Sequence, residues 1–456
     1  AAHVLTPSIF KANDIRGVVT GDHPQWDRAG AHAIGAAFVR VLGLQGKQFV
    51  LARDMRASGA ELSAAFTEGA LGQGADVIDV GLASTDQLWY ASGHFRVPGI
   101  QFTASHNPAE YNGVKFCLAD AAPIQPAMLT EIARLAMGPA LPATERPGTR
   151  REQDVLSEYA AHLHALVPLD GMRRLKVVYD AGNGMAGHTA PAVLQPLNLE
   201  LIGLFTDLDG SFPNHPPNPL EPENLLDAQA AVHEHGADLA LVFDGDADRC
   251  FIIDERGEPV SPSLITALIA QQELQREPGG TIVINTITSR AVNRVVAEAG
   301  GRVVVSPVGH TSVKGLMAQH RAIFGGEHSA HYYFRDFWGA DTGMLAALHV
   351  LALLGRASGT MSELVAELPQ YASSDELNST VDDAAAVTDR VAAAFAGRGV
   401  VDHDDGLTIE SDDWWVNVRS SNTEPLLRLN VEARNEVLMT ALRDEALAII
   451  RGGTDA

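Results

Sequence analysis

Two short polar segments carry the residue types that phosphoryl transfer needs. Residues 103–108 read Thr-Ala-Ser-His-Asn-Pro and place the hydroxyl of Ser105 directly after the apolar run 99–102. Residues 244–249 read Asp-Gly-Asp-Ala-Asp-Arg and place three carboxylates at alternate positions. A hard divalent cation binds through such oxygen ligands. A phosphorylated serine held near this acidic triad would form a phosphoryl-transfer site, which neither segment indicates alone.

The acidic segment predicts a magnesium site at Asp244, Asp246 and Asp248. Three carboxylates on one tight loop repel one another strongly without a cation. A calcium-binding EF-hand loop also spaces acids alternately, but its sixth position needs glycine for a sharp turn, and here it is Arg249. The flanking segments are also strand-like. Mg²⁺ takes a few carboxylates plus a phosphate oxygen, so phosphorylated Ser105 is expected as a fourth ligand. Arg249 could hold phosphate or support the acids.

Three residues of the serine segment and its surroundings remain open to simpler interpretations. Ser105 could be a turn serine that satisfies its own backbone, a role for which Ser and Asn are well suited. His106 could orient the loop, bind phosphate or be purely structural. Lys115, on the following apolar run, could reach the same phosphate as a point charge.

A third polar loop, residues 326–331, is predicted to bind sugar hydroxyls. Glu327 and Ser329 together suit vicinal hydroxyls, and the alternative is an ordinary polar hairpin. A zinc site built from Glu327, His328 and His331 is conceivable, but the spacing is not diagnostic.

A fourth loop, residues 419–424, is predicted to hold a phosphate group. Arg419 is followed by hydroxyl and amide side chains and by a run of backbone N–H donors, a combination that makes an anion nest. The alternative is a capped surface turn. Residues 180–184, Asp-Ala-Gly-Asn-Gly, lack the third glycine of a dinucleotide fingerprint, and we interpret them as a strand-to-helix turn.

An internal repeat supplies the elements that must position these loops. Three times a strand-like run is followed by a helix-like stretch and a second strand-like run, as βαβ units around a mainly parallel sheet require. The copies are 49–54, 58–71 and 75–80; then 175–179, 185–194 and 199–204; then 281–284, 289–299 and 302–305. After each copy comes a strand–loop–strand segment, 99–116, 239–253 or 322–334, whose loop is one of the first three polar loops.

The last stretch departs from this repeat. Residues 414–419 and 427–431 alternate in polarity, which predicts antiparallel strands, and 384–396 and 436–451 are typical of amphipathic helices. We therefore predict an α/β protein with three similar mixed α/β domains and a smaller α+β C-terminal domain. The predicted domains are 1–150 with the serine loop, 151–256 with the metal loop, 257–370 with the sugar loop, and 371–456 with the phosphate loop.

Composition limits the class of protein. The chain has 33 Lys and Arg against 57 Asp and Glu, a formal charge of −24, which argues against nucleic acid or an anionic membrane as the main partner. The two cysteines, Cys117 and Cys250, lie in apolar runs and are expected to be buried thiols. No signal peptide is visible, and the longest nearly apolar run, 343–355, is too short to span a bilayer. These features predict a soluble, cytoplasmic protein.

Together these loops resemble the α-D-phosphohexomutase family, most closely its bacterial phosphomannomutase/phosphoglucomutase branch. The resemblance runs from residues 10–17, Phe-Lys-Ala-Asn-Asp-Ile-Arg-Gly, to residues 419–425. It implies a heart-shaped protein of four domains around a central cleft. It also implies reversible phosphoryl transfer between the 1- and 6-positions of hexose phosphates, through a phosphoserine and a hexose 1,6-bisphosphate, with Mg²⁺ as cofactor and the bisphosphate as activator.

The resemblance also implies roles for individual residues. Ser105 matches the phosphoserine, and Asp244, Asp246 and Asp248 match the metal ligands. Arg16, Lys115 and His331 match positions near the reacting groups, and the base is expected among Lys115, His331 and His310. The residues that match substrate contacts are Glu327, Ser329, Gly309 and His310 of the third domain and Arg419, Ser421, Asn422 and Thr423 of the last.

Some departures leave the choice of sugar open. Asn13 stands where much of this branch has an aromatic residue, and His328, Ala330 and Ile287 vary positions that bear on sugar choice. Glucose and mannose phosphates therefore both remain expected substrates. A metal-dependent sugar-phosphate phosphatase using Ser105, and a non-catalytic sugar-phosphate sensor, are the rival functions. A serine hydrolase is disfavoured because no nucleophile-elbow glycines flank Ser105. A monomer is the expected oligomeric state.

Overall fold

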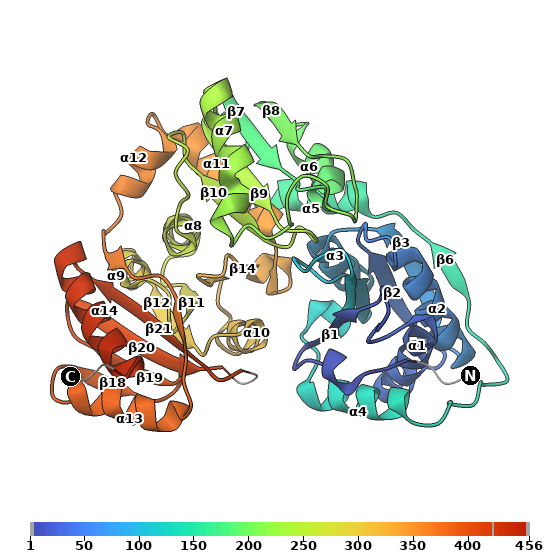
Figure 1. Cartoon of the computed structure of the whole chain (residues 1–456). Helices are drawn as coiled ribbons and strands as arrows, with labels where there is room; N and C mark the ends of the chain where they lie inside the picture. The colour runs from blue at the N-terminus through green and yellow to red at the C-terminus, as the bar shows by residue number, and fades with distance from the viewer. Residues whose placement is uncertain (1–3, 422–423, 453–456) are drawn as a thin grey trace. The chain divides into compact units, whose positions relative to one another are not determined.

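The computed structural model describes residues 4–421 and 424–452, with the side chain of His310 outside the description. The chain forms two compact units. Unit 1 comprises residues 1–262 and 330–364, and unit 2 comprises residues 263–329 and 365–456. Both units contain helices and strands, which confirms the predicted mixed α/β class (Figure 1).

A six-stranded mixed sheet forms the N-terminal part of unit 1, in the order β1-β5-β4-β2-β3-β6. Strand β2 is parallel to β3 and β4, β3 is parallel to β6, and β5 is antiparallel to β4 and β1. The strands are β1 (Asp14–Val18), β2 (Gln48–Arg53), β3 (Asp76–Leu82), β4 (Gly99–Phe102), β5 (Tyr111–Cys117) and β6 (Arg150–Glu152). The helices are α1 (Arg28–Leu42), α2 (Gly59–Gly72), α3 (Thr85–Phe95) and α4 (Pro126–Met137), with short 3₁₀ turns at Pro7–Ile9 and Ala119–Ala121.

Local sequence signals explain these boundaries. The side chain of Asp27 accepts a hydrogen bond from the N–H of Gly30 and so caps the start of α1, and Gly43 ends this helix in the left-handed conformation, with φ 64°. The core beneath α1 and α2 is aromatic, because Phe38, Phe49 and Phe66 pack with ring centroids 5.1–6.1 Å apart.

The second sheet of unit 1 has the order β10-β9-β7-β8. Strands β7, β8 and β9 are parallel, and β10 is antiparallel to β9. All five residues of β9 are buried, as expected for a central strand covered on both faces. The elements are β7 (Leu175–Asp180), β8 (Leu199–Leu204), β9 (Leu239–Phe243), β10 (Cys250–Ile253), α5 (Leu156–Leu166), α6 (Ala186–Leu194) and α7 (Leu226–His235), with a 3₁₀ turn at Pro222–Leu225.

A later segment of the chain returns to unit 1. It contains the antiparallel strands β14 (Tyr332–Phe334) and β15 (Ala340–Asp341), a 3₁₀ turn at Arg335–Phe337 and helix α11 (Gly343–Arg356). The Thr342 hydroxyl caps α11 by accepting a hydrogen bond from the N–H of Leu345. The N–H of Gly343 donates to the carbonyl of Asp248 at 2.9 Å, which ties this helix to the acidic loop.

Unit 2 begins with the third βαβ copy. Strand β11 (Thr281–Asn285) is parallel to β12 (Arg302–Ser306) and to β13 (Phe324–Gly326). The helices of this segment are α8 (Pro262–Arg276), α9 (Arg290–Glu298) and α10 (His310–His320), whereas α12 (Met361–Ala366) lies where the chain passes from unit 1 to unit 2. All three predicted βαβ copies are thus confirmed, because β2/β3, β7/β8 and β11/β12 each form parallel pairs across one helix.

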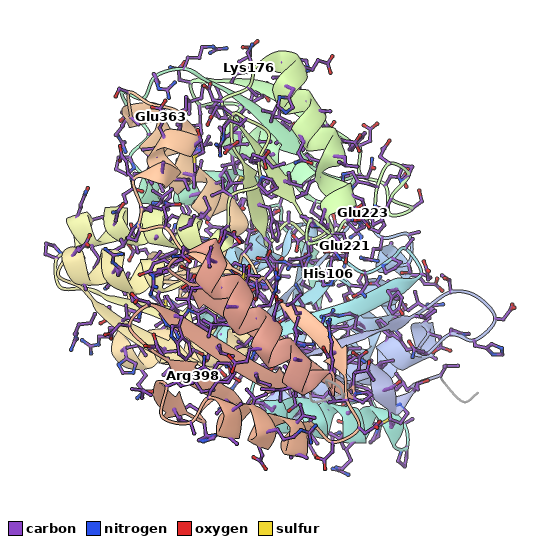
Figure 2. The ribbon with its side chains drawn as sticks, turned by 60° about the vertical axis from the view of Figure 1, so that its left-hand side comes forward. His106, Lys176, Glu221, Glu223, Glu363 and Arg398 are labelled. Atoms are coloured by element: carbon purple, nitrogen blue, oxygen red, sulfur yellow. The ribbon has the colours of Figure 1, made fainter. Side chains whose placement is uncertain are left out.

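The C-terminal part of unit 2 is an antiparallel sheet in the order β16-β21-β20-β19-β18, with β17 also pairing with β21. It confirms the predicted change of architecture. The ion pair between Arg398, labelled in Figure 2, and Glu445 at 2.7 Å links the loop after α13 to α14. The elements are β16 (Ala372–Ser373), β17 (Leu377–Thr380), β18 (Val400–Asp402), β19 (Leu407–Glu410), β20 (Trp414–Ser420), β21 (Leu426–Ala433), α13 (Ala384–Ala394) and α14 (Glu436–Ile450).

Cys117 and Cys250 are both buried, as expected from the sequence, and neither takes part in a disulfide. Across residues 4–421 and 424–452, no helix combines the length and the apolar character that a bilayer span requires.

Helices α1 and α2 approach so closely that glycine is required at their contact. A Cβ atom at Gly35 would lie 2.1 Å from the carbonyl oxygen of Phe66, and one at Gly69 would lie 2.1 Å from that of His32. Both contacts involve backbone atoms, which a rotamer change cannot relieve.

We expect Gly35→Ala to lower the free energy of unfolding by about 1–3 kcal/mol, because the methyl group forces the two helices apart. Gly72→Ala is the matched control, since a Cβ at this end of α2 would meet no atom within 4 Å. The control should be neutral or stabilising by about 0.5–1 kcal/mol, through the loss of unfolded-state entropy. Thermal and urea unfolding of both variants would measure this, and equal stabilities would contradict the close helix contact.

Candidate active site

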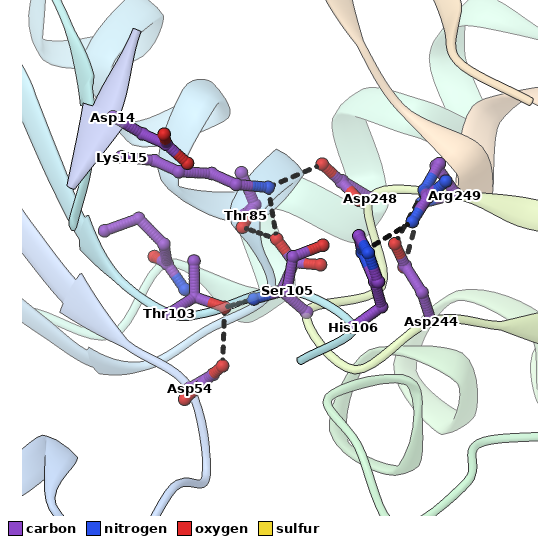
Figure 3. A network of polar contacts seen from close by, with 12 residues as sticks. Asp14, Asp54, Thr85, Thr103, Ser105, His106, Lys115, Asp244, Asp248 and Arg249 are labelled. Carbon is purple, nitrogen blue, oxygen red and sulfur yellow. Dashed lines mark hydrogen bonds and ion pairs between the residues drawn. The ribbon is translucent and has the colours of Figure 1, made fainter. Parts of the chain in front are cut away.

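Ser105 occupies a strained position at the end of a buried strand. It follows β4 by three residues, is 5% exposed, and has a left-handed backbone with φ 53°. Its N–H donates to the hydroxyl oxygen of Thr103 at 2.9 Å, and the Thr103 hydroxyl donates to Asp54 Oδ2 at 2.6 Å (Figure 3). A side chain that is not glycine adopts this conformation only when its surroundings hold it there.

The three predicted metal ligands lie on the turn between β9 and β10. Asp244, Asp246 and Asp248 are 0%, 0% and 3% exposed, and one carboxylate oxygen of each lies within 4.8 Å of the others. The flanking elements are strands, as the sequence predicted in rejecting an EF-hand. A Cβ at Gly245 would lie 2.4 Å from the carbonyl oxygen of Ser105, so the glycine lets the two loops touch.

Two cations partly balance the acidic triad. Lys115 on β5 places Nζ 2.7 Å from Asp246 Oδ2 and 3.0 Å from Asp248 Oδ2. Arg249 donates from Nε to Asp244 Oδ2 at 2.9 Å. Burial alone would lower the pKa of Lys115, but the two neighbouring carboxylates outweigh this and raise it above its usual value.

The remaining oxygens of the triad fit a divalent cation. Asp246 Oδ1 and Asp248 Oδ1 are buried without a hydrogen-bond partner. Burial, together with the negative charges of Asp248 and Asp246, raises the pKa of Asp244 well above its usual value. Buried carboxylate oxygens of this kind are costly unless a proton or a cation satisfies them. Oxygen donors in this number suit Mg²⁺ better than softer metals.

His106 and Arg16 flank the serine. His106 Nδ1 lies 3.1 Å from the guanidinium of Arg249. Burial, with the positive charges of Arg249 and Arg16, lowers the pKa of His106 to about 3, so its ring is neutral near pH 7. Arg16 on β1 donates to Asn107 Oδ1 at 3.2 Å and pairs with Asp14 at 2.6 Å. Both residues therefore contact the surroundings of Ser105.

His331 also lies in unit 1, beside the acidic triad. One ring nitrogen of His331 and one carboxylate oxygen each of Asp248 and Asp341 lie within 4.8 Å of one another. Trp89 Nε1 donates to Asp341 Oδ1 at 3.1 Å, which fixes this carboxylate. Among the described residues, neither group with metal-ligand geometry contains Glu327 or His328, so the zinc alternative gains no support.

The predicted sugar-binding residues belong to unit 2. Glu327 is 2% exposed, and its Oε2 accepts hydrogen bonds from Asn285 Nδ2 at 3.0 Å and from the N–H of Gly309 at 3.4 Å. Glu327 and Gly309, two of the residues predicted to contact the substrate, are thus brought together. Ser329, in the same loop as Glu327, is half-buried. The backbone of His310 begins α10, but its side chain lies outside the described residues.

The predicted phosphate loop follows β20 in the C-terminal sheet. The Arg419 side chain donates to Glu376 Oε1 at 2.9 Å and to Asn417 Oδ1 at 3.2 Å. Ser421 follows in the chain, and its hydroxyl accepts a hydrogen bond from the N–H of Glu424 at 3.3 Å. Asn422 and Thr423 lie outside the described residues.

Sequence reasoning missed Thr85, which begins α3. Its hydroxyl donates to Asp246 Oδ2 at 2.5 Å, and its N–H donates to the Asp246 carbonyl at 3.0 Å. Next to it, buried Asp86 accepts hydrogen bonds from Ser84, Tyr159 and Thr342. Burial, opposed by the Ser84 and other hydroxyl hydrogen bonds, raises the pKa of Asp86 to about 6. No local motif points to Thr85, because its partner Asp246 lies 161 positions away in the sequence.

Asp54 and Thr103 were also missed as functional residues, although a signal for them exists. Strands β2 and β4 are parallel neighbours, so the residues after their carboxyl ends meet at one edge of the sheet. Asp54 directly follows β2, and Thr103 directly follows β4. The parallel pairing of the two predicted strands would therefore have been enough to place Asp54 and Thr103 beside Ser105.

Family comparisons cover nearly all of the chain. Profiles described as phosphoglucomutase/phosphomannomutase alpha/beta/alpha domains I, II and III match residues 7–138, 157–257 and 261–371. The profile of the C-terminal domain of the same family matches residues 376–449.

Individual relatives agree with the profiles. A phosphomannomutase of Salmonella typhimurium is 39% identical over 453 residues, covering 97% of this chain and 98% of that protein. A protein of Xanthomonas campestris pv. campestris named "Phosphohexose mutases" is 37% identical, covering 98% and 100%. A crystal structure of a phosphoglucomutase/phosphomannomutase family protein from Burkholderia thailandensis matches with a TM-score of 0.89 at 34% identity, covering 99% of each chain. The chain therefore belongs to the α-D-phosphohexomutase family of enzymes, in its bacterial phosphoglucomutase/phosphomannomutase branch.

Proposed function

We propose that this protein reversibly moves a phosphoryl group between the 1- and 6-positions of hexose phosphates, with glucose phosphate, mannose phosphate or both as substrates. The observation that carries the proposal is the contact between two loops. Ser105, held in a left-handed turn, lies against an acidic loop in which two buried carboxylate oxygens have no hydrogen-bond partner. Family membership supports the same activity.

The proposed reaction consists of two transfers through one serine. Phosphorylated Ser105 donates its phosphoryl group to the free hydroxyl of a hexose monophosphate, so the bond from phosphorus to Ser105 Oγ breaks and one to the sugar oxygen forms. The product is a hexose 1,6-bisphosphate, which turns around and returns its other phosphoryl group to Ser105. Added hexose 1,6-bisphosphate should act as an activator, because it can phosphorylate Ser105 in an enzyme that has lost its phosphate.

The charged residues around Ser105 suit this chemistry. Mg²⁺ held by Asp244, Asp246 and Asp248, with an oxygen of phosphorylated Ser105, would offset charge on the transferring group. Arg249 fixes the orientation of Asp244 through its 2.9 Å hydrogen bond. Lys115, already a cation between two carboxylates, is placed to add positive charge next to them.

A base must take the proton of the attacking sugar hydroxyl. Lys115, His331 and His310 are the candidates. The contacts favour His331, because it is close to Asp248 and Asp341, whose carboxylates can orient its ring. The pairing of Lys115 with Asp246 and Asp248 favours a role for this residue as a cation.

Recognition of the sugar and of the distal phosphate is assigned to unit 2. Glu327 and Ser329 would bind sugar hydroxyls, with Gly309 in the same group. The phosphate that is not reacting would be held by Arg419, Ser421, Asn422 and Thr423. The guanidinium of Arg419 would bind the phosphate in the same way whichever end of the sugar carries it, and the turnaround of the intermediate requires this.

The proposal predicts isomerisation without hydrolysis. Glucose 1-phosphate and mannose 1-phosphate would be incubated separately with protein, Mg²⁺ and a trace of glucose 1,6-bisphosphate, and followed by phosphorus NMR. We expect one or both to become the 6-phosphate while inorganic phosphate stays at the blank level. Stoichiometric release of inorganic phosphate without isomer would instead identify a phosphatase and overturn the proposal.

Replacing the proposed carrier should abolish turnover but not folding. We expect Ser105→Ala to lower kcat by about 1,000-fold or more, because no other group then accepts the phosphoryl group. Ser157→Ala on the exposed face of α5 is the matched control and should keep full activity. Steady-state assays and circular dichroism would compare the variants, and a turnover near that of the wild type in Ser105→Ala would rule out the serine carrier.

Cation binding should stabilise the protein through the acidic triad. We expect Mg²⁺ to raise the thermal midpoint of the wild type, with about 2.7 kcal/mol of stabilisation at a hundred times the dissociation constant. Asp246→Asn should lose most of this rise, because it removes one of the repelling charges that the cation offsets. Glu200→Gln, at an exposed acid on β8, should keep the rise. Differential scanning calorimetry would measure it, and an undiminished rise in Asp246→Asn would place the cation elsewhere.

A further inference from the structure

Arg56 is a buried arginine whose hydrogen-bond donors converge on the serine loop. It lies just after β2 and is 3% exposed. One terminal nitrogen donates to the carbonyls of Pro108 at 2.7 Å and Tyr111 at 3.1 Å, and the other to those of Asn107 at 2.8 Å and Ser105 at 3.1 Å. A single side chain thus satisfies four main-chain carbonyls of one loop.

The surroundings of Arg56 explain how a buried cation is tolerated. Its Nε lies 3.5 Å from Asp54 Oδ2, and its guanidinium carbon lies 5.2 Å from the centre of the Phe212 ring. A Cβ at Gly210 would lie 2.8 Å from Arg56 Cα, so the loop that carries Gly210 and Phe212 packs directly over the arginine. Burying this charge is costly unless its partners are correctly placed.

Both main-chain polar groups of Ser105 are consequently held by one network. Its carbonyl accepts from Arg56, and its N–H donates to Thr103, whose hydroxyl donates to Asp54. Asp54 also pairs with Arg56, which closes the network. We call Arg56, Asp54 and Thr103 the cradle. It acts on the residue whose left-handed backbone, at φ 53°, needs an external constraint.

We propose that Arg56 is a positioning residue for phosphoryl transfer, which fixes the backbone of the serine loop so that the Ser105 hydroxyl stays aligned with the acidic loop. This inference rests on the proposed function and adds a residue that does not touch the substrate. Four carbonyls at different angles require the planar guanidinium with its five donors, and a lysine ammonium cannot reach them together. Misplacement of a reacting group by about 1 Å typically lowers a rate by about 100-fold.

The test is Arg56→Lys, which keeps the positive charge but removes the planar guanidinium and its set of donors. We expect kcat to fall by about 100-fold, while KM for the hexose phosphate changes by less than about threefold, because the sugar-binding residues are untouched. A purely structural role would lower the thermal midpoint and leave kcat per folded molecule unchanged. A kcat within about threefold of that of the wild type in the folded variant would overturn the inference.

Two controls separate positioning from stability. Arg150→Lys makes the same change in the same sheet, at a residue that pairs with Asp79 at 2.8 Å on β3, away from the serine loop. Val77→Ala on β3 opens a cavity at a residue that is 1% exposed and lowers stability without touching the cradle. Both should keep kcat near the wild-type value; a loss in Val77→Ala equal to that in Arg56→Lys would attribute the effect to stability and overturn the inference.

A second pair of variants covers the case in which Arg56→Lys does not fold. Thr103→Val removes the hydroxyl that holds the Ser105 N–H and keeps the shape of the side chain, while Thr103→Ser keeps the hydroxyl. We expect kcat to fall in Thr103→Val and to be largely restored in Thr103→Ser; equal values of kcat in the two variants would overturn the inference.

The wild type is assayed first. Its failure to isomerise any hexose phosphate would overturn the proposed function, whereas an active wild type with an equally active Arg56→Lys would overturn only the role of Arg56.

Discussion

The mutual repulsion of three buried carboxylates is the constraint on which the site depends. Asp244, Asp246 and Asp248 are almost fully buried on a single turn, where unbalanced negative charge is costly. Lys115 and Arg249 supply two positive charges, and two carboxylate oxygens remain without a partner. The turn therefore carries excess negative charge, which a bound divalent cation would offset, and the serine loop lies against it.

The rest of unit 1 fixes the position of this charged turn. Strands β9 and β10 hold its two ends, Thr85 at the start of α3 holds Asp246, and the start of α11 holds the carbonyl of Asp248. These contacts come from three separate stretches of the chain. The acids and the serine consequently occupy loops that are anchored on several sides, as transfer between fixed positions requires.

Much of this could be predicted from the sequence, because periodicity and loop chemistry are local. The βαβ copies, the alternating segments 414–419 and 427–431, and the loops of Ser105 and the three aspartates all follow from short patterns. Thr85 could not be predicted in this way, since its partner Asp246 is 161 positions away in the sequence. Arg56 was missed for a similar reason: its charge is typical of an exposed residue, and only the fold shows that its donors point inward to carbonyls about 50 positions later.

In the proposed reaction, Ser105 carries the phosphoryl group between the two ends of the sugar. The most direct measurement is to incubate the protein with glucose 1,6-bisphosphate labelled with ³²P at both positions, digest it and locate the labelled peptide. We predict label on the peptide that contains Ser105, and its removal by excess unlabelled hexose monophosphate with recovery of the label in hexose phosphates, because the bisphosphate returns its other, unlabelled phosphoryl group to Ser105. Label on another peptide, or label on Ser105 that unlabelled hexose monophosphate does not remove, would show that Ser105 is not the phosphoryl carrier.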